Sequence, residues 1–134
     1  MKILTTAAIL LGLSSLIATP SLVLAHHSVG SSFDVEQTVS FEGTVSKIEW
    51  FNPHIWFYVA TLAEDGSTVE YQCEGGSPNS LRRRGWSKDS VKVGDHVTVV
   101  GLKARTDPYS CYTRSVKLMD GTQLFSGNAA ELER

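Results

Sequence analysis

The chain has 134 residues, of which 42% are hydrophobic and 19% charged, and its formal net charge at pH 7 is -2. This length supplies one modest hydrophobic core and not two, so any function must be carried by one small domain. The mildly acidic charge disfavours a protein that holds polyanions such as nucleic acids.

Residues 1–25 have the pattern of a secretory signal peptide. The chain starts with Met-Lys, continues almost without interruption through apolar residues, and places small side chains at Val23 and Ala25. A signal peptidase inspects these two positions, so we expect cleavage after Ala25 and a periplasmic or secreted protein without a membrane segment. The alternative is an uncleaved anchor, because the apolar stretch is long enough to span a bilayer.

The first strand is expected to follow an N-terminal arm at residues 26–38. From Val39 to Trp50, apolar and polar residues alternate with a period of two, and the phase shifts beside Gly43. Such a shift indicates a bulged or coiled strand. We expect the folded domain to cover residues 39–126 and to be followed by a C-terminal tail at residues 127–134.

Two further strands follow. Residues 54–62 and 68–74 read as strands, and the intervening Asp65-Gly66 is a hairpin turn signal. Side chains alternate between the two faces of a strand. The second strand has a purely apolar set, so we expect that set in the core and the other set on the outer face. The apolar set is Ile55, Phe57 and Val59, and the outer set is His54, Trp56 and Tyr58.

A short helix and two more strands complete the pattern. Ser77 can cap a helix that starts at Pro78, and Gly85 suits the position after its end. Consecutive residues of a helix point about 100° apart, so Arg82, Arg83 and Arg84 would point in different directions. This favours three solvent-exposed side chains over a single row that binds phosphates. A fourth strand is expected to start at Val93-Gly94-Asp95 and to run through Leu102, and a fifth to cover residues 111–119, with a short final segment ending near Phe125. Three strands, a helix and two strands predict an all-β, five-stranded, OB-fold-like Greek-key barrel.

Cys73 and Cys111 are the only cysteines. An even count in an exported chain favours a disulfide, and the OB-fold places its third strand beside its fifth, where these residues lie. The alternative is a Cys/His metal site, but neither cysteine belongs to a CxxC or CxxH pair.

Cleavage after Ala25 would leave His26 as the first residue. A free N-terminal histidine offers its amine and Nδ1 in one chelate ring, and one more imidazole completes a histidine brace suited to Cu(II). The candidates for the third nitrogen are His54, His96 and the adjacent His27. The alternative is a polar arm that happens to begin with histidine.

A second hypothesis needs no metal. Trp56 and Tyr58, with His54 and the nearby Trp86, predict an aromatic surface that binds a periplasmic protein, a glycan or another small ligand. The alternative is that these rings pack under the arm or against Trp86. No GxSxG, HExxH or Walker sequence occurs, so we expect a non-catalytic binding protein, with copper as the preferred ligand and no nucleic-acid partner.

The chain resembles a family of small exported bacterial proteins of unknown function. The resemblance covers nearly all of the chain after residue 25, and the family implies an exported β-barrel domain without an agreed activity. It rests on these phrases: Ala25-His26-His27-Ser28, Phe33-Asp34, Gly43-Thr44-Val45, Glu49-Trp50-Phe51-Asn52-Pro53-His54, Gly76-Ser77-Pro78-Asn79, Arg83-Arg84-Gly85-Trp86 and Val93-Gly94-Asp95.

Overall fold

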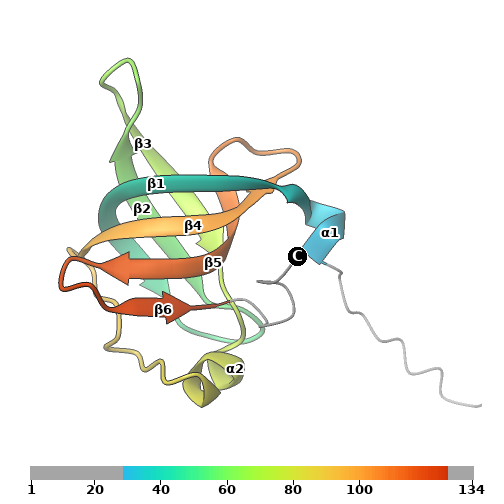
Figure 1. Cartoon of the computed structure of the whole chain (residues 1–134), viewed down its shortest axis with the longest axis vertical. Coiled ribbons are helices and arrows are strands. Elements are labelled where there is room, and N and C mark those ends of the chain that lie inside the picture. Colours follow the sequence, from blue (N-terminus) through green and yellow to red (C-terminus); the bar gives the residue numbers. More distant parts are fainter. Residues whose placement is uncertain (1–28, 127–134) are drawn as a thin grey trace, which may run out of the picture.

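A computed structural model describes residues 29–126 (Figure 1). The predicted signal peptide, the histidines His26 and His27, and the tail at 127–134 lie outside these residues. The elements in chain order are α1 (Val29–Ser32), β1 (Phe33–Glu49), β2 (Trp56–Leu62), β3 (Thr68–Glu74), α2 (Pro78–Arg83), β4 (His96–Ala104), β5 (Ser110–Leu118) and β6 (Gln123–Phe125).

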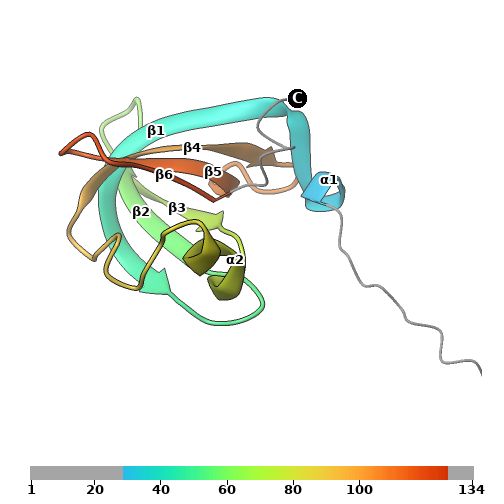
Figure 2. The ribbon, with the colours of Figure 1, turned by 60° about the horizontal axis from the view of Figure 1, so that its bottom comes forward.

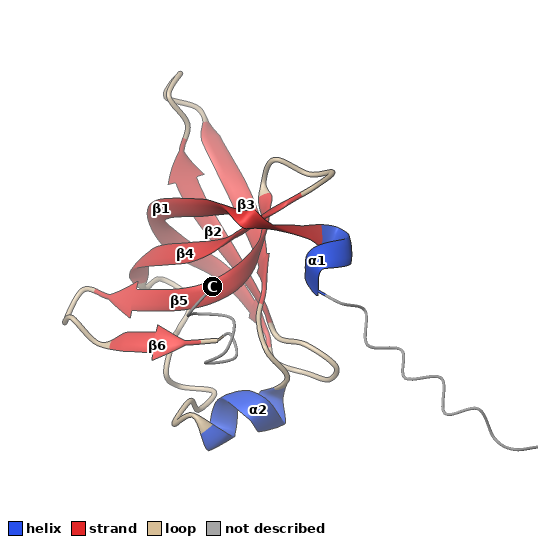
Figure 3. Ribbon diagram, turned by 45° about the vertical axis from the view of Figure 1, so that its right-hand side comes forward, coloured by secondary structure: helices blue, strands red, loops and turns tan. Residues whose placement is uncertain are grey.

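The strands form one sheet that curls round and closes on itself. Their order is β3-β2-β1-β4-β5-β6, with antiparallel neighbours throughout, and β3 also pairs with β5 in a parallel arrangement. The first five strands therefore make a closed ring of pairings, visible in the curl of the sheet in Figure 3. This confirms the predicted all-β, OB-fold-like architecture with one short helix between the third and fourth strands.

The first strand is longer than the sequence predicts. It begins at Phe33, which lies opposite Ala104 of β4, and its register shifts between Asp34 and Thr38. Side chains along this stretch are mainly exposed, so no alternating apolar pattern marks it as a strand. The expectation that residues 26–38 form an arm outside the sheet is therefore wrong for residues 33–38.

The core lies inside the ring, and the predicted inner face of β2 is confirmed. Ile55, Phe57 and Val59 are at most 1% exposed. At the end of the strands where α2 lies, away from the β2–β3 turn (Figure 2), fully buried Leu81 joins this core. The helix starts as predicted, because the Ser77 side chain accepts a hydrogen bond from the Ser80 amide.

Trp86 requires a correction. It was expected on a partner-binding surface, but it is 3% exposed and its ring packs 5.7 Å from that of Phe57. Its Nε1 donates a hydrogen bond to the Phe125 carbonyl at 3.1 Å. A tryptophan that follows the helix closing the barrel is positioned to fill the core, and the indole N–H is satisfied by a neighbouring strand.

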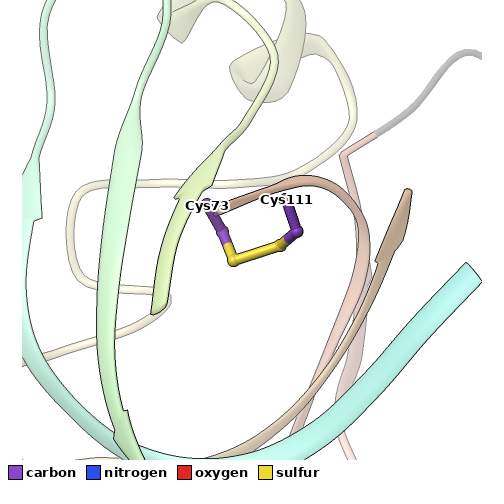
Figure 4. Close-up of a disulfide and its surroundings, with 2 residues drawn as sticks. All are labelled: Cys73 and Cys111. Carbon is purple, nitrogen blue, oxygen red and sulfur yellow. A yellow bond between two sulfur atoms is a disulfide. The ribbon is translucent and has the colours of Figure 1, made fainter. Parts of the chain in front are cut away.

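The predicted disulfide is confirmed. Cys73 lies directly opposite Cys111 in the parallel β3–β5 pairing, with 4.5 Å between their Cα atoms (Figure 4). Both residues are fully buried. The bond therefore joins the two strands whose pairing closes the ring.

Truncating Phe57 tests the assignment of the two faces of β2. Phe57→Ala should lower the free energy of unfolding by about 3–5 kcal/mol, because it leaves a cavity among buried neighbours. Tyr58→Ala, on the half-buried outer face, should cost much less. Urea denaturation of both variants measures the difference, and a larger loss in Tyr58→Ala would reverse the assignment.

Removing the disulfide tests how far it stabilises the ring. The bond spans 38 residues, and the double variant Cys73→Ala/Cys111→Ala should lose about 4 kcal/mol in the chain-entropy description. Urea denaturation gives the free energy, and intact mass before and after reduction shows whether the wild-type bond is present. Thiols that alkylate without prior reduction would contradict the assignment.

Candidate metal and partner site

His54 lies in the loop between β1 and β2, against the residues that follow β3. Its Nδ1 lies 3.1 Å from the Gly75 carbonyl oxygen and 3.0 Å from Glu74 Oε1. A carbonyl oxygen only accepts hydrogen bonds, so Nδ1 is the nitrogen that carries the proton in this contact. The lone pair of a neutral His54 is then on Nε2, and the side chain is 43% exposed.

The backbone around His54 is held from both sides. The Gly75 amide donates to the Ile55 carbonyl at 2.8 Å, and the Ile55 amide donates to the Gly76 carbonyl at 3.2 Å. The Gly76 amide in turn donates to Oγ of the buried Ser126 at 2.9 Å. A Cβ at position 75 would lie 2.7 Å from the Ile55 side chain, so this close approach requires glycine. Segments from three parts of the chain thus fix the imidazole.

A row of outer-face residues connects His54 to the far side of the sheet. Five residues, one from each of β1, β2, β3, β5 and β4, lie opposite one another in successive strand pairings. We name this set the outer-face row: Glu49, Trp56, Glu74, Tyr112 and Leu102. Residues directly opposite one another in paired strands share a face and lie close enough to interact. The closing β3–β5 pairing is the step that places Glu74 beside Tyr112.

The N-terminal end of the described residues is anchored on this row. Phe33 is 5% exposed, its ring lies 5.7 Å from that of Tyr112, and both pack with Leu102. Val29 of α1 packs against the same cluster. The Arg105 side chain and amide also hold α1, because they donate to the carbonyls of Gly30 and Ser32. With neighbouring strands about 4.8 Å apart, His54 lies on the order of 15 Å from Phe33.

Tyr58 lies on the outer face as predicted, but its hydroxyl and its ring already contact neighbouring side chains. Its hydroxyl donates to Glu49 Oε2 at 2.9 Å, and the Lys47 ammonium lies 4.7 Å from its ring centroid. Lys47 also pairs with Glu49. The hydrogen bond from Lys47 is the main cause that lowers the pKa of the Glu49 carboxyl, and the hydrogen bond from Tyr58 is the second. Burial, followed by the bond to Glu49, raises the pKa of the Tyr58 phenol.

Glu74 is the least solvated carboxylate of the row. Burial raises its pKa, and the nearby His54 only partly opposes this effect. The side chain is 19% exposed, whereas that of His54 is more than twice as exposed. The pair therefore combines a half-buried acid with an accessible imidazole.

The histidines proposed as metal ligands do not all come together. His96 starts β4 on the exposed surface, and its register neighbour Thr44 pairs with Ala60 of β2. Ala60 is six residues beyond His54, which corresponds to about 20 Å along a strand. Within residues 29–126, no three His, Cys, Asp or Glu side chains are grouped to hold a metal ion.

Sequence reasoning identified His54, Trp56 and Tyr58 but missed the partners that position them. No motif in the sequence marks Glu74, and Phe33 and Tyr112 were not recognised as neighbours of the site. The available signal was the disulfide, because a Cys73–Cys111 bond in neighbouring strands also places the next residues, Glu74 and Tyr112, side by side.

The fold and the outer-face row define a small OB-fold-like β domain with a histidine-bearing loop. The chain belongs to a family of unknown function, DUF6152, whose family model matches residues 14–110. No curated protein matches the chain. Among solved structures, it is similar to the crystal structure of Rim1, a mitochondrial single-stranded DNA binding protein from S. cerevisiae. The TM-score is 0.49 and the identity 17%, over 68% of this chain and 96% of that chain. Within the described residues, no helix is long and apolar enough to cross a membrane.

Replacing Glu74 tests which effect controls its ionisation. Because burial raises the pKa of this carboxyl above the usual 4.5, the folded state binds its proton more tightly than the unfolded chain does. Wild-type stability should therefore fall as pH rises through that raised value. Glu74→Gln does not titrate, so its free energy of unfolding relative to wild type should rise between pH 4 and pH 7 in urea denaturation.

Glu70→Gln, at an exposed position on the same strand, is the matched control. A relative stability of Glu74→Gln that falls toward neutral pH would show that attraction to His54 outweighs burial.

Proposed function

We propose that the exported, mature protein is a non-catalytic binding protein for Cu(II), held by the amine and imidazole of His26 and by His54. The observation that carries this proposal is the packing of Phe33 on Tyr112, in the same outer-face row as the Glu74 partner of His54. It anchors the N-terminal segment on the side of the sheet where an accessible imidazole nitrogen is available.

The chain length supports this arrangement. Val29 packs against the anchor cluster, and His26 lies three residues before it in the chain. Three extended residues span about 10 Å, and the histidine side chain adds to this reach. This reach supports ligation of one metal ion by His26 and His54, whereas His96 lies about 20 Å from His54 along the strands.

The chemistry of the nitrogens also fits. An N-terminal amine and its own imidazole form a chelate, and Cu(II) lies near the top of the affinity order for such nitrogen sites. Metal-binding histidines usually donate their other ring N–H to a carbonyl or carboxylate, which orients the ring and raises its basicity. The contacts of His54 Nδ1 with Gly75 and Glu74 provide this support.

A second candidate is a protein- or glycan-binding surface that uses His54, Trp56 and Tyr58 without metal. The half-buried position of both aromatic rings on the outer face favours it. Trp86 no longer belongs to this surface. We propose no nucleic-acid partner in either case, because Glu49, Glu70 and Glu74 on this face would repel phosphates.

Competitive copper titrations against a chelator of known affinity test the proposal. His54→Ala should weaken Cu(II) binding by at least about tenfold, since losing even an outer-shell partner of a ligand has that effect. A protein with one extra glycine before His26 should also lose most of its affinity, because its amine no longer belongs to the chelate. Binding should weaken as pH falls through the ordinary imidazole range, about 6.5, where ligand nitrogens become protonated.

His96→Ala is the matched control and should bind copper as wild type does. Circular dichroism of each variant excludes loss of fold as the cause. Equal affinity in the glycine-extended and correctly processed proteins would eliminate the proposed site and favour the metal-free surface. An N-terminal sequence of the exported protein that starts elsewhere than His26 would do the same.

A further inference from the structure

A cavity lies at the opposite end of the barrel from α2. An open cavity of about 500 Å³ is bordered by the β2–β3 turn and the loop between β4 and β5, which lie at the same end of the strands in Figures 1 and 3. This volume falls within the usual range of ligand sites, about 300–1,000 Å³. The cavity shares no lining residue with the proposed copper site, and its nearest member on β3, Tyr71, lies three residues, or about 10 Å along the strand, before Glu74. The cavity is therefore separate from the proposed copper site.

Three aromatic rings form one wall of the cavity. Phe41 and Tyr71 stack with centroids 3.9 Å apart, and Tyr71 meets Tyr109 edge to face at 5.5 Å. Tyr109 is 42% exposed, so its ring remains accessible beside an otherwise packed pair. Its backbone is fixed, because the Gln72 amide donates to the Tyr109 carbonyl and the Tyr109 amide donates to Asp107. These backbone bonds and the contact with Tyr71 place the Tyr109 ring at the cavity.

Another part of the border is negatively charged. Glu64 and Asp65 line the cavity at the β2–β3 turn, and none of its described lining residues is Lys or Arg. The Asp65 carboxylate accepts hydrogen bonds from the amide and hydroxyl of Ser67, which lower its pKa and keep it ionised. Carboxylates beside accessible aromatic faces attract a cation both by Coulomb interaction and through the ring quadrupole.

We propose that this cavity binds a small organic ammonium ion, with its alkyl groups against Tyr109 and its charge toward Glu64 and Asp65. A neutral sugar could also stack on Tyr109, but two carboxylates with no Lys or Arg among the described lining residues favour a positively charged ligand over a polyol. A lipid headgroup fits less well, because its phosphate would lie close to the same carboxylates. The proposal does not depend on copper binding.

Calorimetric titration with choline tests this inference. Its neutral isostere 3,3-dimethylbutan-1-ol should bind about tenfold more weakly, because it lacks the charge. Phosphocholine, which represents the lipid headgroup, should also bind more weakly. Tyr109→Ala should remove binding, whereas Tyr109→Phe should keep it. Glu64→Gln should weaken choline binding without disturbing the Asp65–Ser67 turn.

His54→Ala is the control that separates the two sites, and it should bind choline as wild type does. No detectable choline binding, equal binding of choline and its neutral isostere, or unchanged binding by Tyr109→Ala would each overturn the proposal. Binding of a neutral oligosaccharide such as cellotriose in preference to choline would overturn it in favour of a glycan site.

Discussion

The parallel pairing of β3 with β5 is the constraint on which the rest of the structure depends. Without it the six strands would form an open sheet with β3 at an edge, and the inner faces of β2 and β3 would lose part of their cover. The Cys73–Cys111 bond lies within this pairing and joins its two strands covalently. For a domain with one small core, a covalent closure contributes a substantial share of a typical stability of about 5–15 kcal/mol.

The same pairing organises the surface. Directly after the disulfide, Glu74 and Tyr112 become neighbours on the outer face, which connects the His54 loop with the cluster that anchors Phe33. At the residue before Cys73, the Gln72 amide donates a hydrogen bond to the Tyr109 carbonyl and helps to position the Tyr109 ring in the cavity beside the β2–β3 turn. A surface histidine–glutamate pair on one side and an aromatic and acidic cavity on the other thus follow from a single closure of the sheet.

Sequence patterns were sufficient for the features governed by local chemistry. The alternation of Ile55, Phe57 and Val59 predicted the buried face of β2, and Ser77-Pro78 predicted the start of α2. Features that depend on contacts between distant parts of the chain were harder to predict. The polar stretch after Phe33 gives no periodic signal, although pairing with β4 makes it a strand. The sequence around Trp86 also does not show whether this tryptophan packs in the core or contacts a ligand. The partners of His54 depend on register across β2, β3 and β5, which local sequence does not encode.

The central claim is that the N-terminal segment and the β1–β2 loop share one metal ion. Pulsed electron paramagnetic resonance of the Cu(II)-loaded mature protein measures it most directly, because the hyperfine couplings of remote imidazole nitrogens count the histidines bound to copper. The account predicts two imidazoles in the wild-type protein and one in His54→Ala. An unchanged count in His54→Ala would contradict it, since the copper would then be held without the β1–β2 loop.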